Sequence, residues 1–297
     1  MQYTSTVVPR LAAAGQQFVA QPRQAAALRV DVNSVLRERV PGLYRWMPRF
    51  VVRWLERYIC QEQMNEVLQA TAGRKGSSFC AGVLDYLDAA YTLEGEENLP
   101  APEQTNVIYV SNHPLGALDG ICLIDMVRRR HGVEPHFVVN DLLSVLKPLD
   151  NVFIPINKHG RQSRDAVKEV DAAFADLRRP VIMFPAGLCS RQQKGQPVRD
   201  LEWNKMFVQK SADAGRTVVP VRFEGENSKG FYRLARLRQR LGIKFNLEMI
   251  RLPREIFLNR GARFAIKAGC QIGPEELERG PRAAECAAGI RQRVYEL

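Results

Sequence analysis

From residue 101 onward, short apolar runs alternate with longer amphipathic stretches, and this alternation limits the possible folds more than any other feature. A short apolar run bounded by turn residues is typical of a buried β-strand, whereas apolar residues that recur every three or four positions are typical of a helix. Strands that alternate with helices form a mostly parallel sheet with helices on both faces, an α/β fold. We predict strands at residues 107–110, 136–139, 152–156, 181–184 and 218–223, helices at 121–130, 164–178 and 205–214, and a late edge strand at 264–272.

The chain before Pro100 has a different character. Residues 31–100 are helical in pattern and lack the alternation that is typical of strands. The first 30 residues include a stretch rich in Ala and Gln, which indicates an irregular segment. A chain of 297 residues can bury a sizeable core. We therefore predict an irregular segment at 1–30, an N-terminal helical extension at 31–100 and one large α/β domain at 101–297.

One predicted strand ends in residues that are suited to acid–base chemistry. In residues 107–120 (VIYVSNHPLGALDG), His113 follows the apolar run, and five residues separate it from Asp119. Ligands of open α/β sheets bind at the carboxyl ends of strands. If the chain folds back at Gly116, Asp119 can accept a hydrogen bond from one imidazole nitrogen while the other nitrogen removes a proton from a hydroxyl or amine. The alternative is that both residues only cap the following helix.

Three further segments also contain a short apolar run that is typical of a strand. Residues 181–191 read VIMFPAGLCSR, residues 151–161 read NVFIPINKHGR, and residues 217–221 read TVVPV. With the His/Asp segment, they resemble in order the four sequence blocks of the glycerolipid acyltransferase superfamily, which includes the 1-acylglycerol-3-phosphate acyltransferases. The chain departs from the usual pattern in its longer His/Asp spacing, in Ala186 at a Glu position and in Cys189 at an Arg position. The short sequences NHPLG and FPAG are similar to those of a variant branch of these acyltransferases in Bacteroidetes-type bacteria.

The resemblance implies a lipid-biosynthesis enzyme that moves a fatty acyl group from an acyl thioester to the hydroxyl of a lysolipid acceptor. His113 would be the general base and Asp119 would orient it. The acceptor would be lysophosphatidate-like or an N-acyl amino-acid lipid, as in glycine lipid synthesis, and the donor would be carried by acyl-carrier protein or coenzyme A. We expect no metal and no other cofactor. The implied substrate-binding residues are Lys158, Arg161, Pro185, Gly187, Ser190 and Arg191.

Within this set, the cations predict an anion site. Residues 158–164 (KHGRQSR) carry three cations before a predicted helix, and the N-terminus of a helix favours anions. We expect Lys158, Arg161 and Arg191 to converge on the anionic group of the acceptor, although Arg161 could instead pair with an acidic residue of the helix. Backbone amides near Gly187 are expected to stabilise the oxyanion.

A predicted helix that begins near Pro48 combines two stripes of side chains. Arg45, Arg49, Arg53 and Arg57 recur every four residues, and a parallel aromatic stripe lies beside them. Indole rings beside guanidinium groups suit a bilayer interface, whereas an ordinary helix would pack its aromatics in the core. The family resemblance favours membrane contact, for which we predict Trp46, Arg49, Phe50, Arg53, Trp54 and Arg57.

A second basic stripe lies on the predicted helix at 231–241. Arg233, Arg236 and Arg240 share one face, and Leu234, Leu237 and Leu241 share another. The arginines could dock an acidic carrier protein or lipid headgroups, but a solvated face is the simpler interpretation.

Charge and composition limit the partners and the setting. Lys and Arg number 43 against 32 Asp and Glu, a net charge of +11, which favours anionic partners. No apolar stretch reaches the roughly 18 residues of a spanning helix, the start of the chain does not resemble a secretory signal, and the six cysteines lack metal-site or disulfide spacing. We expect a peripheral enzyme on the cytoplasmic side of the inner membrane. The alternatives are a basic nucleic-acid-binding protein, which lacks a recognised motif here, and a lipid hydrolase with water as acceptor.

Overall fold

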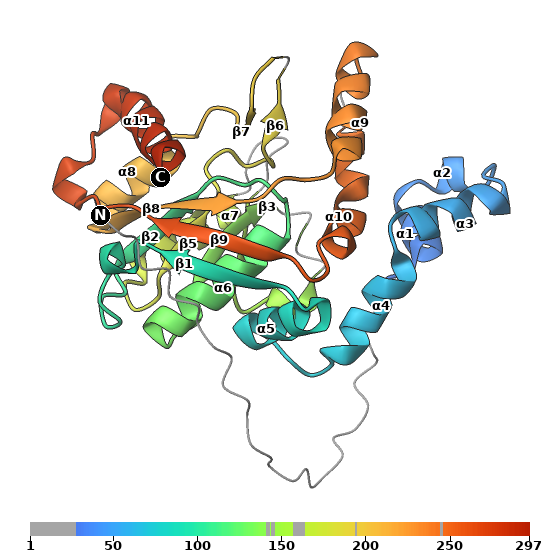
Figure 1. Cartoon of the computed structure of the whole chain (residues 1–297), viewed down its shortest axis with the longest axis horizontal. Coiled ribbons are helices and arrows are strands. Elements are labelled where there is room, and N and C mark those ends of the chain that lie inside the picture. Colours follow the sequence, from blue (N-terminus) through green and yellow to red (C-terminus); the bar gives the residue numbers. More distant parts are fainter. Residues whose placement is uncertain (1–27, 141–142, 144–145, 157–163, 194, 244–245) are drawn as a thin grey trace, which may run out of the picture.

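A seven-stranded sheet forms the centre of the protein, with the strand order β1-β9-β8-β2-β5-β3-β4 (Figure 1). The computed structural model describes residues 28–297 except 141–142, 144–145, 157–163, 194 and 244–245. Neighbouring strands are parallel except β8 and β9, so the predicted mostly parallel sheet is confirmed. The strands are β1 (Ala90–Glu94), β2 (Val107–Ser111), β3 (His136–Asn140), β4 (Phe153–Ile156), β5 (Val181–Met183), β8 (Thr217–Glu224) and β9 (Arg263–Ala268).

Helices cover both faces of the sheet, as predicted. Successive side chains of a strand point to opposite faces: Val107 and Tyr109 of β2 join the core on one side, and Ile108 and Val110 join the core on the other. Burial on both faces explains why this strand is a continuous apolar run. One face packs against α5 (Gly76–Leu87) and α6 (Leu118–His131), and the other against α7 (Arg164–Ala175), α8 (Met206–Ala214) and α11 (Ala283–Glu296).

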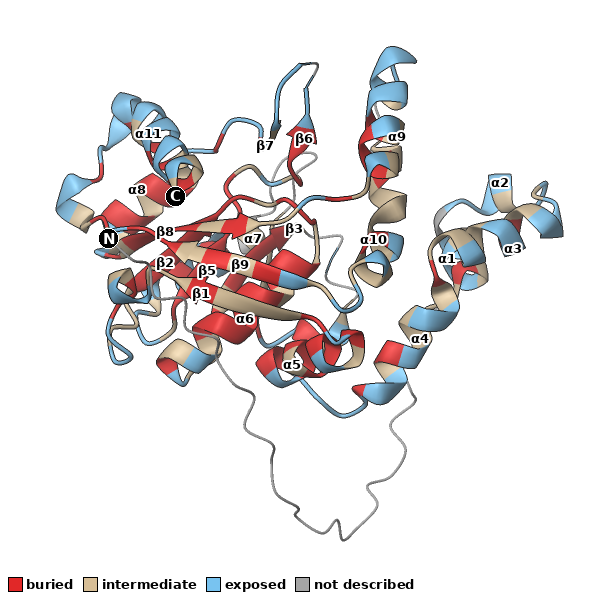
Figure 2. Ribbon diagram, viewed as in Figure 1, coloured by how far each residue is buried: buried red, intermediate tan, exposed pale blue. Residues whose placement is uncertain are grey.

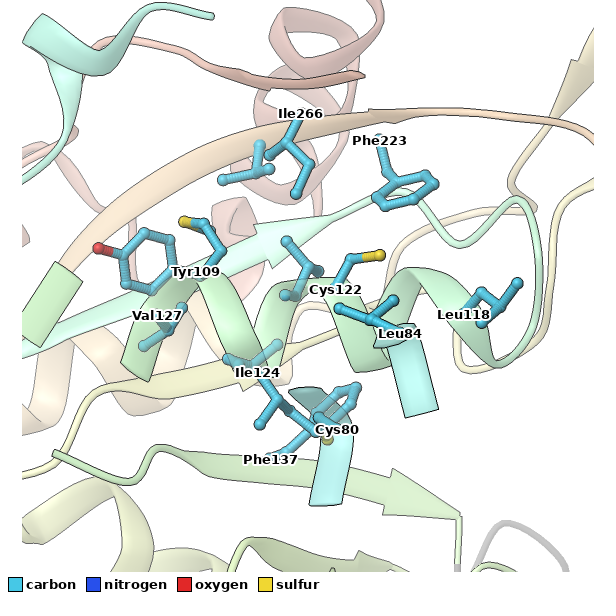
Figure 3. Close-up of a cluster of buried hydrophobic side chains, with 14 of the residues drawn as sticks. Cys80, Leu84, Tyr109, Leu118, Cys122, Ile124, Val127, Phe137, Phe223 and Ile266 are labelled. Atoms are coloured by element: carbon cyan, nitrogen blue, oxygen red, sulfur yellow. The ribbon is translucent and has the colours of Figure 1, made fainter. Parts of the chain in front are cut away.

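Helix α6 is held between the sheet and α5. Figure 3 shows its side chains Leu118, Cys122, Ile124 and Val127 among residues of both neighbours. Leu118 is buried in the first turn of the helix. The start of α6, which carries Asp119, is therefore fixed in position by the core.

The prediction that residues 31–100 lack strands is wrong for β1. This strand pairs in parallel with β9, from Ala90 opposite Arg263 to Glu94 opposite Lys267. It lies at the edge of the sheet, and only Leu93 is buried, so its sequence lacks the apolar run of a central strand. Together with α5, it contributes side chains to the same core as the α/β domain.

The late strand is shorter than predicted. It ends at Ala268, after which the N–H of Gly269 donates to the carbonyl oxygen of Pro220 and Ile272 forms an isolated bridge to Val218. A small antiparallel pair, β6 (Arg191–Gln192) and β7 (Val198–Arg199), has no counterpart in the prediction.

The N-terminal helices extend to one side of the sheet, next to α9 and α10 (Figure 1). No helix in the described ranges is both long enough and apolar enough to cross a membrane. Of the predicted irregular segment 1–30, residues 1–27 lie outside the described residues. The remaining helices are α1 (Val32–Arg39), α2 (Pro41–Tyr44), α3 (Arg49–Tyr58), α4 (Gln61–Ala70), α9 (Lys229–Arg240) and α10 (Leu252–Leu258). Short 3₁₀ turns are η1 (Glu96–Asn98), η3 (Lys147–Leu149), η4 (Leu247–Arg251), η5 (Pro274–Glu276) and η6 (Gly280–Arg282).

Candidate active site

The carboxyl end of β2 presents His113 from the middle of the sheet, between β5 and β8. Asn112 fixes where the chain leaves the sheet. Its side-chain Nδ2 donates to the carbonyl oxygen of Phe223 at 2.9 Å, and the N–H of Phe223 donates to its Oδ1 at 2.7 Å. The Asn112 side chain thus continues the pairing with β8 beyond the strand.

The loop after His113 folds back so that Asp119 meets the imidazole. Nδ1 of His113 lies 2.9 Å from Oδ2 of Asp119. Gly116 permits the reversal, because its φ of +81° lies in the left-handed region that favours glycine. The carboxylate also accepts backbone N–H groups of Leu115 at 2.9 Å, Gly116 at 3.3 Å and Gly120 at 3.0 Å. The same carboxylate therefore fixes the imidazole, the loop and the first turn of α6.

These contacts determine which ring nitrogen of a neutral His113 can accept a proton. Burial disfavours the charged form of Asp119, but the attraction of His113 and the hydrogen bonds outweigh it and hold the pKa of Asp119 below its usual value. An ionised carboxylate can only accept, so Nδ1 carries the proton and the lone pair of the neutral imidazole lies on Nε2. Nε2 has no hydrogen-bond partner within the described residues. The ring stacks on Phe184, with centroids 3.9 Å apart.

A second buried carboxylate, Asp200, supports the same loop from the other side. Its Oδ1 accepts the backbone N–H of His113 at 3.1 Å and the hydroxyl of Ser190 at 2.6 Å, and its Oδ2 accepts Nε1–H of Trp203 at 2.9 Å. The N–H of Ser190 in turn donates to the carbonyl oxygen of His113 at 2.7 Å. Asp200 therefore ties the loop after β2 to the segment after β5. Asp200 lies outside the four sequence blocks and is not among the predicted site residues.

Opposing effects act on the pKa of Asp200. Burial dominates and raises the pKa above its usual value, although the hydrogen bonds from Ser190, Trp203 and the His113 backbone oppose that rise. Its side chain accepts three hydrogen bonds and donates none, which is the pattern of an ionised carboxylate. Its backbone N–H donates to the hydroxyl of Tyr295 at 2.6 Å, so α11 also supports the site.

The segment after β5 forms a turn beside His113. The N–H of Gly187 donates to the carbonyl oxygen of Phe184 at 2.9 Å, and the carbonyl oxygen of Pro185 accepts the N–H of Asn204 at 3.0 Å. Gly187 itself is exposed, with a φ of +63°. Burial raises the pKa of the Cys189 thiol to about 11, so this residue is poorly suited to act as a nucleophile.

Arg191 lies in a different environment from the one expected. Its side chain is buried, and its guanidinium pairs with Oε1 of Glu248 at 3.0 Å and donates to the carbonyl oxygen of Cys189 at 2.9 Å. Glu248 is also paired with Arg238 of α9 at 2.9 Å. A guanidinium held in this way supports the packing of η4 and α9 rather than reaching a bound lipid. The other two predicted acceptor cations, Lys158 and Arg161, lie outside the described residues.

The aromatic stripe of the N-terminal helices is exposed. Trp46, Phe50 and Trp54 are 75%, 73% and 58% exposed, so the alternative in which these rings fill the core is wrong. Val52 is the one residue of α3 that is buried. The arginines at 49, 53 and 57 are exposed as well, so α3 and the preceding Trp46 present the side chains predicted for membrane contact to the outside.

His131 has structural partners at both ring nitrogens. Nε2 of His131 lies 2.7 Å from the hydroxyl of Tyr109, and Nδ1 lies 2.9 Å from the carbonyl oxygen of Pro102. Among the described residues, no group of three His, Cys, Asp or Glu side chains could hold a metal ion.

Two curated relatives and a family model agree with the resemblance found in the sequence. Two relatives described as lyso-glycine lipid O-acyltransferases, from Bacteroides thetaiotaomicron and Phocaeicola vulgatus, are each 40% identical to this chain over 268 residues, which is 90% of this chain and 97% and 95% of theirs. The crystal structure of the 1-acyl-sn-glycerophosphate (LPA) acyltransferase PlsC from Thermotoga maritima aligns with a TM-score of 0.44 and 17% identity, over 82% of this chain and 94% of that chain. A family model described as "Acyltransferase" matches residues 34–297. The chain belongs to this acyltransferase family.

Proposed function

We propose that this protein transfers a fatty acyl group from an acyl thioester to the hydroxyl of a lyso-glycine lipid. The observation that carries the proposal is the hydrogen bond between His113 and Asp119, which leaves the basic Nε2 without a described partner at the carboxyl end of β2. Family membership supports the acyl-transfer class, and the substrate named for the two relatives supports the acceptor. The donor is carried by acyl-carrier protein or coenzyme A.

In the proposed reaction, Nε2 of His113 takes the proton of the acceptor hydroxyl as its oxygen attacks the thioester carbonyl carbon. The C–O bond forms, the carbonyl electrons move to the oxygen, and the oxyanion collapses as the C–S bond breaks. The imidazolium returns the proton to the departing thiolate. Asp119 stabilises the positive charge that builds on the ring, and amides near Gly187 stabilise the oxyanion by about 3 kcal/mol for each donor.

We assign the other predicted substrate-binding residues to different roles according to their surroundings. Pro185 and Gly187 belong to the turn beside His113, and we assign this turn to the thioester carbonyl. The hydroxyl of Ser190 is bonded to Asp200, so we assign Ser190 to positioning the loop. Lys158 and Arg161 remain our candidates for the carboxylate of the glycine headgroup. Replacing both with Ala should raise the KM for the acceptor more than the KM for the donor; equal changes in both would contradict this assignment.

We further propose that the enzyme acts as a peripheral protein on the cytoplasmic side of the inner membrane. The net charge of +11 favours anionic headgroups. The exposed Trp46, Phe50 and Trp54 beside arginines suit the headgroup layer, where rings and cations are both accommodated.

The direct test is a product assay on the purified full chain with a panel of acceptors. Acyl-carrier protein and coenzyme A thioesters are each supplied with lyso-glycine lipid, lysophosphatidate or no acceptor, and the products are identified by mass spectrometry. We expect the doubly acylated glycine lipid as the main product. Preferential acylation of lysophosphatidate would contradict the acceptor, and free fatty acid formed equally well without acceptor would instead support the hydrolase alternative.

A further inference from the structure

Helix α9 is anchored firmly along one side. Phe231, Tyr232 and Ala235 are buried, and Ser228 caps the start of the helix by accepting the N–H of Phe231 at 3.3 Å. Further along, Arg238 forms its ion pair with the fully buried Glu248. These contacts set the orientation of the helix, so the side chains on its opposite side are presented in a fixed arrangement.

That opposite side exposes leucines together with arginines. Leu237 and Leu241 are 53% and 64% exposed, and they stand one turn apart. Arg233 precedes them by one further turn, and Arg236 and Arg240 form the adjacent row; all three arginines are exposed. Leu237 and Leu241 are therefore left largely uncovered by the described protein, whereas Leu234, which the sequence grouped with them, is half-buried. We call these five residues the α9 outer face.

The charge of this region has one sign. From residue 229 to residue 243 the sequence contains no Asp or Glu. Figure 2 shows the outer part of α9 exposed and standing away from the sheet, while its inner part is buried. The basic side chains of the helix are Lys229, Arg233, Arg236, Arg238 and Arg240.

Helix α9 is connected through neighbouring residues to the loop after β2 and to α3. Nδ2 of Asn227, just before the helix, donates to the carbonyl oxygen of Pro114 at 3.0 Å. Pro114 belongs to the loop after β2 that carries His113. The 3₁₀ turn η4 supplies Glu248 to α9, and its Arg251 lies 6.0 Å from the ring centroid of Tyr58 in α3. A surface that engages both helices would therefore lie beside the carboxyl end of β2.

We propose that the α9 outer face is a second membrane contact, which inserts Leu237 and Leu241 into the interface of an anionic bilayer while its arginines bind lipid phosphates. Exposed aliphatic side chains flanked by guanidinium groups match the two layers of such an interface. An acidic carrier protein would complement the arginines but would leave the protruding leucines without an apolar layer to enter. The inference rests on the proposed function only in that the acceptor is a membrane lipid.

The test uses the full chain and vesicles that contain equal parts of phosphatidylglycerol and phosphatidylcholine, with sedimentation as the readout. Two double variants address the two layers: Leu237→Ser with Leu241→Ser, and Arg236→Glu with Arg240→Glu. Each should weaken vesicle binding by on the order of tenfold or more while melting like the wild type, because the changed side chains are exposed. The matched control is Arg282→Glu with Arg293→Glu, which makes the same change in net charge at and beside α11, away from α9 (Figure 1). It should bind nearly as well as the wild type.

The outcomes separate this inference from the proposed function and from a protein partner. Wild-type binding by both α9 variants, or equal losses in the control, would overturn the inference whatever the enzyme catalyses. Unchanged vesicle binding with a raised KM for the acyl-carrier-protein thioester alone would show a carrier site instead. Because sedimentation needs no turnover, an inactive protein that still binds through α9 would contradict the proposed function and leave this inference standing.

Discussion

The loop after β2 and the exposed aromatic stripe of Trp46, Phe50 and Trp54 both carry residue types that often mark function, but the protein holds them in opposite ways. Asp119 is fully buried and accepts hydrogen bonds from the imidazole and from backbone amides. Trp46 and Phe50, in contrast, are about three-quarters exposed. A site preorganised by internal hydrogen bonds needs no partner to acquire its geometry. An exposed stripe acquires its role only when a surface covers it, so changes in the two regions should affect different measurements.

The largest effect is expected at the catalytic pair. His113→Ala should lower kcat by about 10²–10⁴-fold because the base is lost, and Asp119→Asn should be similarly severe because the imidazole loses its orienting acceptor. Steady-state kinetics with a soluble thioester checks both. Asp125→Asn is the control, since Asp125 is a buried carboxylate of the same helix that pairs with Arg129 at 2.7 Å. It should lower stability and leave kcat nearly unchanged; a parallel loss of kcat would mean that any buried carboxylate of α6 matters.

The second effect concerns Asp200, for which we propose a positioning role through its hydrogen bond to the loop after β2. Asp200→Asn places an NH₂ group against either the Trp203 N–H or the His113 N–H, so one donor faces another. We expect kcat to fall by about tenfold or more, with smaller changes in both KM values, from the roughly 1–3 kcal/mol cost of an unsatisfied buried donor. Adding Trp203→Phe removes one donor and allows the amide oxygen to face His113. The double variant should therefore have a higher kcat than Asp200→Asn. Trp203→Phe alone should not raise kcat above that of the wild type. Failure of this rescue would leave Asp200 with only a general role in stability.

The third effect should appear only when a bilayer is present. Changing Arg49, Arg53 and Arg57 together to Glu should abolish sedimentation with anionic vesicles at low salt, at about 1 kcal/mol for each well-placed cation. Trp46→Ala with Trp54→Ala should weaken the salt-resistant part of the binding. Turnover of water-soluble substrates should be unchanged. Since these rings are exposed, the variants should melt like the wild type; unfolding of the Trp variant would show that the stripe contributes to packing.

The smallest effect is the pH dependence of stability at the two carboxylates that flank His113. The pKa of Asp119 is lower in the folded protein than its usual value, so its stabilising contribution is present above about pH 4 and is lost as the pH falls through the folded pKa. The pKa of Asp200 is raised, so its contribution to stability increases as the pH falls through its folded pKa. Urea unfolding at a series of acidic pH values should show the advantage of wild type over Asp119→Asn shrinking with acid and its advantage over Asp200→Asn growing. The same trend for both variants would contradict the opposite shifts.

The sequence predicted the parts of the fold whose signal is local. Central strands such as β2 are buried on both faces and therefore appear as apolar runs, and the His/Asp segment follows such a run. Edge strand β1 has only Leu93 buried and depends on pairing with β9, which is distant in sequence, so it was mistaken for part of a helical region.

The features of the site that the sequence did not reveal also depend on contacts between distant parts of the chain. Asp200 meets His113 only after the chain folds, and the burial of Arg191 depends on Glu248, far along the sequence. On α9, periodicity predicted separate arginine and leucine faces, but it did not reveal that Leu237 and Leu241 stay exposed beside the arginines. Periodicity identifies which side chains share a face, whereas the neighbours of that face are set by the tertiary structure.

The central claim is that His113 deprotonates the acceptor hydroxyl for direct attack on the thioester. The most direct measurement is thiol release from a soluble acyl thioester, followed in the presence and absence of lyso-glycine lipid for the wild type and His113→Ala. The proposed mechanism predicts rapid release only when wild-type protein and acceptor are both present, with no burst of thiol before the acceptor is added. Equally fast release without acceptor, or release that persists in folded His113→Ala protein, would contradict it.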